Sequence, residues 1–386
     1  MRTRKAGIFA ALGSVALLAG CTGAEAETQQ SEPAEQSGVE ASGARVIVDD
    51  LGREVEIPEN VETIVPLGNA PRVVTYVGCA DKVIGVGGHR NPEDTTPVTA
   101  YEYANKDLWA DLPNVGTDFK GETDYFPEEI VALNPDVIIT SYGEDLVEDI
   151  ATKTGLPVIA VDAGSTGGPA ANLFTPEYND ALRLVAEVCG TEDRADDLID
   201  FMDENLDDLK ERTKDVSDED RPTVLGAAAS SRGFHGIDSV YVNYPVFDVI
   251  HANNLAEGIS DQTGGVSVDK EQILVWDPEY IFLDSAGVSV VQQDYEENPE
   301  FYEQLQAVQN GHVYQHPSST SMFSNVEIPI ANAYYIGSLL YPEEFEDVDF
   351  KTKANEIFQY FLGTDDHYGS LEEYGEGYTP VTLGSK

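Results

Sequence analysis

Basic residues and cysteine are both scarce in this sequence of 386 residues. Lys and Arg number 22 against 71 Asp and Glu, and there are three cysteines. A chain with so much negative charge is repelled by the phosphates of nucleic acid, so no nucleic acid is expected as a partner. An acidic surface also keeps a protein soluble, and the charge alone therefore names no ligand.

The sequence also lacks the short motifs that are typical of catalysis. It contains no Gly-x-Ser-x-Gly, His-Glu-x-x-His, Walker or Cys-x-x-Cys pattern. His312 and His316 have the spacing of a metal site on a helix. The residues between them favour a strand, however, and Pro317 follows at once, so we expect loop or solvated histidines there. These absences favour a binding protein that is not an enzyme and has no cofactor or metal of its own.

The first twenty residues have the pattern of a secretory signal. Three basic residues precede an apolar run over 8–18, which is shorter than the roughly 20 residues of a membrane span. The run ends in Leu-Ala-Gly-Cys, which resembles the lipobox of bacterial lipoproteins and implies cleavage before Cys21 and lipidation of its thiol. We therefore predict a lipoprotein signal peptide over 1–20 and an extracytoplasmic protein anchored to the cell membrane. An ordinary signal peptide is the alternative.

Residues 21–44 predict a flexible tether between the lipid and the folded body. The segment consists mostly of small and polar residues, which bury too little apolar surface to offset the entropy lost on ordering. Removal of residues 1–20 removes three basic and no acidic residues, which changes the net charge from −49 to −52.

A duplicated pattern indicates two domains of similar build. The roughly 340 residues beyond the tether are more than a single core usually serves. Residues 128–139 and 271–282 each combine a short helix, a turn marked by proline and an apolar strand. We therefore predict α/β lobes over 45–175 and 222–345, with chance similarity of common turn residues as the alternative.

Helical periodicity predicts the connection between the lobes. Apolar residues recur at helical spacing over 176–188 and 192–214, with Gly190 as a break between them. A bridging helical segment over 176–215 is therefore expected in place of a loose linker. Residues 346–386 are expected to form a C-terminal helix and tail.

The start of the first lobe predicts two further elements. Alternating residues on both sides of an Asp- and Gly-containing turn predict a β-hairpin over 46–58. Residues 83–86 have the apolar composition of a short buried strand. Cys79 and Cys189 lie near the ends of apolar helical stretches, and we expect two buried small residues rather than a disulfide scaffold, although their pairing stays open.

Three motifs occur in a characteristic order along the chain. Asp-x-Gly-Arg-x-Val begins at Asp50, Glu-x-Ile-x-Ala-Leu-x-Pro-Asp-x-Ile-Ile spans 128–139, and Asn-Gly-His-Val-Tyr begins at Asn310. Together with the lipobox, this series resembles the Fe/B12-type substrate-binding proteins of ABC importers over about residues 45–362. The resemblance implies two similar α/β lobes joined by a long helix, with a ligand cleft between the lobes.

The same resemblance implies the function and the partners. A ferric siderophore or similar iron chelate would be captured and delivered to an ABC permease and its ATPase, with a cobamide or haem as the alternative ligand. We expect the protein to act as a monomer. An extracytoplasmic enzyme and a lipid-anchored scaffold are the candidates from other classes, and a scaffold would show no thermal shift with a small molecule.

Candidate ligand-binding residues follow the predicted strands, because ligands of α/β lobes bind at the carboxyl ends of strands. Arginine can hold a carboxylate through two hydrogen bonds, and an aromatic ring can cover a flat chelate. Surface ion pairs for the arginines and core packing for the tyrosines are the alternatives. The predicted site consists of Asn69, Arg72, His89, Arg90 and Tyr142 in the first lobe and of Arg232, His235 and Tyr241 in the second.

Glu128 and Glu271 are predicted to contact the permease. The resemblance implies one acidic residue per lobe that pairs with arginine of the permease, and these two residues match the motif. Each also begins a short helix, where a carboxylate favours the helix dipole, and this is the competing interpretation. Glu129 and Gln272 beside them leave the register uncertain by one residue.

Overall fold

The first lobe is built on a small parallel sheet. The computed structural model describes residues 43–88, 95–119, 122–162, 175–230, 233–261, 264–320 and 325–384. Strands β3 (Ile64–Leu67), β6 (Val137–Thr140) and β7 (Val158–Ala160) pair in parallel in the order β3-β6-β7, and every residue in them is buried. Burial on both faces explains why these strands are continuous apolar runs without alternation.

The second lobe has a larger mixed sheet. Its order is β11-β9-β8-β12-β13-β14, and β10 pairs with β8 beside this path. Strands β8, β10, β12 and β13 are parallel, while β9, β11 and β14 run antiparallel to their neighbours. The bounds are β8 Thr223–Ala227, β9 Ser239–Val242, β10 Asn253–Asn254, β11 Gly264–Ser267, β12 Tyr280–Asp284, β13 Val313–His316 and β14 Thr379–Pro380.

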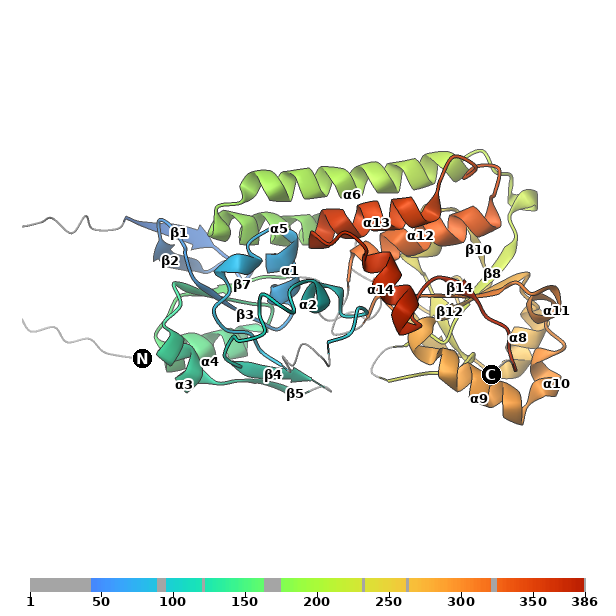
Figure 1. Ribbon diagram of the computed structural model, residues 1–386, viewed down its shortest axis with the longest axis horizontal. Coiled ribbons are helices and arrows are strands. Elements are labelled where there is room, and N and C mark those ends of the chain that lie inside the picture. The colour runs from blue at the N-terminus through green and yellow to red at the C-terminus, as the bar shows by residue number, and fades with distance from the viewer. Residues whose placement is uncertain are drawn as a thin grey trace, which may run out of the picture. The chain divides into compact units, whose positions relative to one another are not determined.

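Most helices pack around these sheets (Figure 1). The first lobe contains α1 (Ala70–Tyr76), α2 (Ala100–Ala104), α3 (Pro127–Leu133) and α4 (Glu144–Thr154). The second contains α7 (Pro245–Val249), α8 (Lys270–Trp276), α9 (Val288–Glu297), α10 (Pro299–Tyr302), α11 (Gln306–Asn310) and α12 (Glu327–Leu340). The C-terminal helices α13 (Phe350–Leu362) and α14 (His367–Tyr374) follow, and α13 packs on α12 and also contacts α1 and α2. The two-lobe α/β class predicted from the sequence is confirmed.

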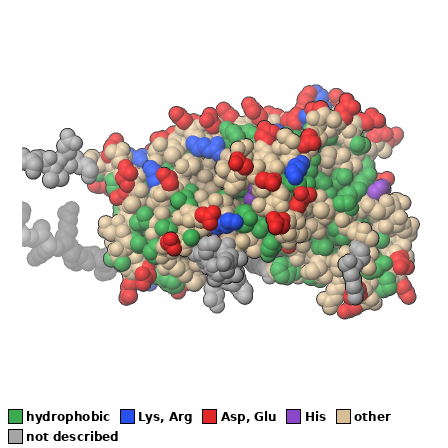
Figure 2. Space-filling view, in the orientation of Figure 1, with side chains coloured by type: hydrophobic (Ala, Val, Ile, Leu, Met, Phe, Trp, Pro, Cys, Tyr) green, Lys and Arg blue, Asp and Glu red, His purple; other side chains and the backbone are tan. Residues whose placement is uncertain are grey.

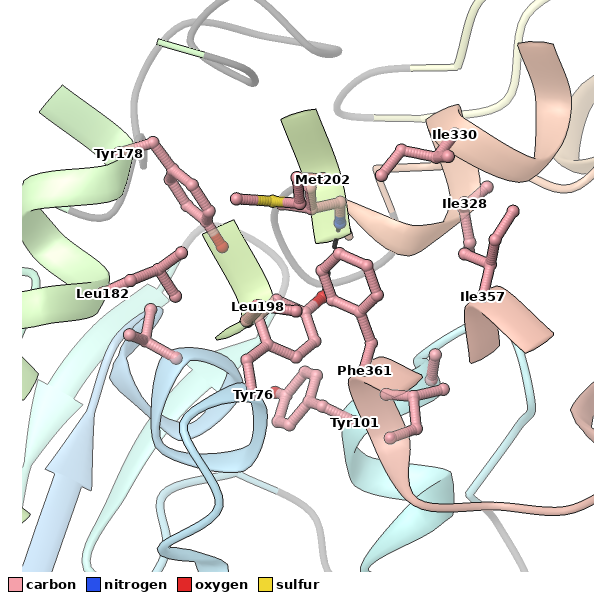
Figure 3. Close-up of a cluster of buried hydrophobic side chains, with 14 of the residues drawn as sticks. Tyr76, Tyr101, Tyr178, Leu182, Leu198, Met202, Ile328, Ile330, Ile357 and Phe361 are labelled. Atoms are coloured by element: carbon pink, nitrogen blue, oxygen red, sulfur yellow. Dashed lines mark hydrogen bonds between the residues drawn. The ribbon is translucent and has the colours of Figure 1, made fainter. Parts of the chain in front are cut away.

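The predicted bridging helices are α5 (Pro176–Cys189) and α6 (Glu192–Thr213), separated by Gly190 in the left-handed conformation. Helix α6 packs against α5 at one end and against α12 at the other, as Figure 1 shows. One buried cluster runs from α1 through α5 and α6 to α12 and α13, so the lobes share a core. Figure 3 shows part of it, with Tyr76, Tyr101, Tyr178, Leu182, Leu198, Met202, Ile328, Ile330, Ile357 and Phe361 labelled.

The predicted hairpin forms, whereas the predicted strand at 83–86 does not. Strands β1 (Ala44–Val48) and β2 (Glu54–Pro58) pair antiparallel. Over 83–86, Val83 bridges only to Ile64 and Val86 only to Asn114. The chain changes partners within four residues, so no ladder can extend. A second, unpredicted hairpin is formed by β4 (Gly116–Phe119) and β5 (Glu122–Tyr125).

Cys79 and Cys189 are both buried, as expected, and they form a disulfide, which answers the question of their pairing that the sequence left open. Their Cα atoms are 6.4 Å apart, across 110 residues of sequence. Lys82 Nζ donates to the carbonyl oxygens of Cys189 (2.6 Å) and Val61 (2.9 Å) beside this bond. The disulfide therefore ties the segment after α1 to the end of α5, a pairing that spacing along the chain does not encode.

The surface carries the excess of negative charge. Acidic side chains outnumber basic ones over the face seen in Figure 2. Within the described ranges, no helix combines the length and the apolar character that crossing a membrane requires.

Candidate ligand site

The carboxyl ends of β3 and β6 meet at Gly68. This glycine has φ +65°, and a Cβ there would lie 2.6 Å from Ser141 Oγ and 2.9 Å from the Tyr142 ring. Only glycine therefore permits this close approach of the two strand ends. The backbone N–H of Asn69 donates to Ser141 Oγ at 2.7 Å, which fixes the start of α1 against the end of β6.

Arg72 projects from α1 and is 1 % exposed. Its Nε donates to Asn325 Oδ1 at 2.9 Å, its Nη1 donates to Asn69 Oδ1, and its guanidinium lies 4.7 Å from the centre of the Tyr101 ring. Asn325 Nδ2 donates in turn to the Val98 carbonyl oxygen at 3.4 Å. These contacts orient a buried cation with neutral amides and an aromatic face, between the first lobe and the segment that leads into α12.

A buried carboxyl group lies close to Arg72. Tyr76 Oη donates to Glu327 Oε2, and the backbone N–H of Val326 donates to Tyr76 Oη at 3.3 Å. Glu327 is fully buried, and burial raises the pKa of its carboxyl group. Tyr178 is also buried, and burial raises the pKa of its hydroxyl group as well. The two contacts made by Arg72 and Tyr76 therefore join α1 to the start of α12.

Asp284 is the centre of a polar cluster at the strand ends of the second lobe. Its carboxylate accepts hydrogen bonds from Tyr241 Oη (2.5 Å), Ser318 Oγ (3.0 Å) and the Ala286 N–H (3.0 Å). Burial raises the pKa of Asp284 to about 6. Thr320 Oγ1 donates to the Ser230 carbonyl oxygen at 2.6 Å, which ties the segment after β13 to the end of β8.

His316 corrects the expectation of a loop or solvated histidine. It is the last residue of β13 and is buried, and burial lowers its pKa to about 4. Its Nδ1 lies 3.0 Å from Asn332 Nδ2. The imidazole is therefore neutral at physiological pH. Among the described residues, no group of three or more His, Cys, Asp or Glu side chains could hold a metal ion.

The structure brings together some of the predicted ligand residues. Asn69 and Arg72 are hydrogen bonded to each other, and Tyr142 is half-buried next to Gly68. Tyr241 is fully buried in the second lobe, stacks on Tyr244 and hydrogen bonds to Asp284. His235 is exposed. The predictions for Cys21, His89, Arg90 and Arg232 fall outside the described residues.

Sequence reasoning missed Asn325, Glu327 and Asp284. Asn325 and Glu327 meet α1 across about 250 residues of chain, and no local pattern reports a contact at that distance. Glu327 stands at the start of an apolar helix, where an acid is ordinarily explained by the helix dipole. Asp284 ends a buried strand, and the strand-end rule applied to Asn69 and Arg72 could have found it.

Glu128 and Glu271 are exposed and lie in the helices α3 and α8. The residue two positions after each of them, Ile130 or Ile273, is fully buried. Each helix is followed by a non-glycine residue in the left-handed conformation. These residues are Asn134 (φ 50°) after α3 and Asp277 (φ 42°) after α8. The duplicated pattern therefore has the same backbone form in both lobes.

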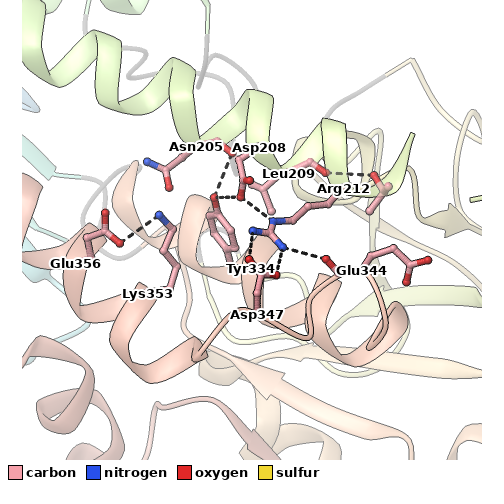
Figure 4. Close-up of polar contacts among 10 residues, drawn as sticks. Asn205, Asp208, Leu209, Arg212, Tyr334, Glu344, Asp347, Lys353 and Glu356 are labelled. Carbon is pink, nitrogen blue, oxygen red and sulfur yellow. Dashed lines mark hydrogen bonds and ion pairs between the residues drawn. The ribbon is translucent and has the colours of Figure 1, made fainter. Parts of the chain in front are cut away.

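A cavity of about 450 Å³ lies elsewhere, between α6 and the C-terminal helices. Arg212 occupies one side of it and binds both carboxylate oxygens of Asp347 (2.6 and 3.0 Å) and Asp208 Oδ2 (2.8 Å). Tyr334 Oη donates to the same Asp208 oxygen at 2.7 Å. Figure 4 shows these contacts, which fasten α6 to the C-terminal segment and lie away from the strand ends.

Comparison with known proteins identifies the family to which this chain belongs. A family model described as periplasmic binding protein matches residues 73–320. The ABC transporter substrate-binding lipoprotein YvrC of Bacillus subtilis is 24 % identical over 353 residues, covering 89 % of this chain and 99 % of the relative. The molybdate-binding protein MolA of Haemophilus influenzae is 25 % identical over 340 residues, covering 83 % and 91 %.

Solved structures agree on the fold. A periplasmic solute-binding protein of Veillonella parvula matches with a TM-score of 0.65 at 18 % identity, over 86 % of this chain and 96 % of that protein. MolA bound to molybdate matches with a TM-score of 0.60 at 23 % identity, over 83 % and 98 %. Both matches support the two-lobed α/β fold of this chain.

Proposed function

The chain belongs to the periplasmic binding protein family, and from this premise we propose that it captures a ferric siderophore or a similar iron chelate outside the cell. At the coarser level it is a substrate-binding protein of an ABC transporter, and its family and relatives are binding proteins, not enzymes. The proposed partners are the permease and ATPase of that transporter.

Arg72 is the observation that carries the choice of ligand class. A guanidinium buried in the first turn of the helix that follows β3 is unusual in a chain with 22 basic and 71 acidic residues. Asn69 and Asn325 hold the Arg72 side chain in one orientation. Binding of a ligand therefore costs little further side-chain entropy at Arg72. Anionic chelates offer the carboxylate or phenolate oxygens that a guanidinium binds well. This supports an anionic metal chelate.

Two other ligand classes fit the same cation. A cobamide carries a phosphate and haem carries two carboxylates, and either can bind a guanidinium. Molybdate is a second candidate of a different kind, because MolA, which is 25 % identical over most of its length, is a molybdate-binding protein. An oxyanion of that size would need further donors beside Arg72.

A lipid anchor on Cys21 would place ligand capture close to the membrane. The pattern before Cys21 and the relative named as a lipoprotein both favour anchoring. We expect Cys21→Ser to release the protein from the membrane fraction or to leave the signal uncut. Mass spectrometry of the wild type should find a lipid on the Cys21 thiol, and an unmodified Cys21 would refute the anchor.

A ligand screen tests the proposed function. The purified protein is titrated with ferric siderophores, haem, cobamides and molybdate, and binding is read as a shift in melting temperature and by calorimetry. Saturable binding of a ferric chelate at the tightest affinity supports the proposal. Preference for haem, a cobamide or molybdate replaces the ligand but keeps the transporter role, whereas a lack of any shift would favour the scaffold.

A further inference from the structure

Helices α3 and α8 occupy equivalent places in the two lobes, so their outward-facing residues correspond. Ile130 and Ile273 point inward and are fully buried. Counting from these residues pairs Glu128 with Glu271 and Ala132 with Val275. Positions four residues apart lie on the same side of a helix, so each outward face consists of a carboxylate and an apolar residue.

The two outward faces differ in chemistry. On α8, Val275 is 78 % exposed beside Glu271, and Lys270 is neutralised by Asp294 at 2.6 Å. The corresponding apolar position on α3 is the smaller Ala132, and Glu129 stands where α8 has Gln272.

The flank of α3 is also apolar, but less exposed. Val131 is 46 % exposed there, while its counterpart on α8, Leu274, is partly buried. Within the helices themselves α3 therefore carries two exposed carboxylates and α8 one, with the exposed Asp269 just before α8, and α8 presents the more exposed apolar side chain.

Exposed valines are common on proteins and need no explanation when they are scattered. Val275 differs because it adjoins the residue proposed to contact the permease, in a unit that the chain contains twice. A partner that pairs basic residues with Glu271 must come within contact distance of a side chain four residues away. Val275 would then be removed from water on docking, which favours the complex.

We propose that the two lobes dock on the permease by different means: α3 through the paired charges of Glu128 and Glu129, and α8 through Glu271 together with burial of Val275. The inference rests on the proposed transporter role. The partner surface is basic opposite α3, and basic with an adjoining apolar depression opposite α8. Attraction between charges mainly raises the association rate and weakens with salt, whereas apolar burial mainly lowers the dissociation rate.

The test uses the permease–ATPase complex of this transporter in lipid nanodiscs and measures association and dissociation rates between low and high salt. Val275→Ser should weaken docking about tenfold at every salt concentration, through faster dissociation. The double variant Glu128→Gln, Glu129→Gln should slow association and flatten its salt dependence. Val48→Ser, at a valine 61 % exposed on the β1 hairpin, is the matched control and should dock like the wild type.

The outcomes separate this inference from the proposed function. If Val275→Ser docks like the wild type while the double variant Glu128→Ala, Glu271→Ala loses docking, the proposed burial of Val275 is wrong. The docking role of Glu128 and Glu271 then stands. Wild-type docking by the double alanine variant as well would overturn the docking role of both helices. Ligand affinity and melting temperature of each variant should match the wild type, because all four side chains are exposed.

Discussion

Arg72 is the single residue on which the proposed site depends most. Its replacement by Gln should weaken binding of the best ligand from the screen about ten- to a hundredfold, because one charge-assisted contact contributes roughly 1.5–3 kcal/mol. Calorimetric titration measures this loss.

Arg212→Gln is the matched control for Arg72→Gln. Arg212 is also held by hydrogen bonds, but it lies at the cavity beside α6, so its loss should lower the melting temperature and leave affinity unchanged. Equal affinity of wild type and Arg72→Gln would show that Arg72 is structural.

His367 should make the protein sensitive to acid. It is buried against the rings of Tyr103 and Phe358, and burial lowers its pKa to about 4. Below pH 6.5 the His367 imidazole becomes protonated in the unfolded chain, whereas in the folded protein it stays neutral down to about pH 4. Stability from this residue is therefore complete above pH 6.5 and falls by about 1.4 kcal/mol per pH unit towards pH 4.

His367→Phe should remove this slope. Urea unfolding between pH 7 and 4 measures the free energy of unfolding of both proteins. The value for the variant should rise relative to that of the wild type as the pH falls. His316 has the same slope, and Asp284, with a raised pKa of about 6, has the opposite one between pH 4 and 6. Both groups are present in both proteins, so their contributions cancel. Parallel curves would contradict the prediction.

The sequence predicted the site residues that lie next to a recognisable strand, and it missed those that come from a distant part of the chain. Asn69 and Arg72 follow an apolar strand directly, and the strand-end rule found them. The partners that orient Arg72 and Tyr76 are Asn325 and Glu327, which come from the other end of the chain. A pattern read along the sequence reports local geometry, and a contact between distant segments exists only after the shared core has formed.

At the scale of elements, helices were predicted better than short strands. The bounds of α5 and α6 agree with the apolar periodicity over 176–188 and 192–214 and with the break at Gly190. Residues 83–86 have the composition of a strand. Val83 bridges to Ile64 and Val86 to Asn114, however, so the segment has no continuous partner strand. Strand identity depends on a neighbour, whereas helix identity is largely local.

The disulfide is the element-scale feature with the largest expected effect on stability. It closes a loop of 110 residues, and a crosslink of this kind typically contributes about 2–4 kcal/mol by restricting the unfolded chain. The double variant Cys79→Ala, Cys189→Ala should lose that amount in guanidinium unfolding without loss of ligand affinity. Unchanged stability would indicate that the two thiols are not joined in the mature protein.

At the scale of the whole molecule, the shared core predicts cooperative unfolding. The cluster that contains Tyr76, Leu198 and Ile328 draws side chains from both lobes and from the bridging helices. Neither lobe can keep this surface buried alone, so both should unfold in one thermal transition. Scanning calorimetry should give equal calorimetric and van't Hoff enthalpies, and two resolved transitions would show independent lobes.

The β1–β2 hairpin has a mechanical consequence if the chain is anchored as we propose. Any pull on the lipid end enters the folded protein at Ala44, the first residue of β1. Arg45 holds this strand to the carbonyl oxygens of Glu187 (2.6 Å) and Val188 (3.1 Å), next to the disulfide at Cys189. Part of any force from a moving membrane would therefore pass into the covalently crosslinked end of α5. The rest would pass into the sheet of the first lobe, because Arg53 of the hairpin donates to the Val158 carbonyl oxygen of β7 at 2.8 Å.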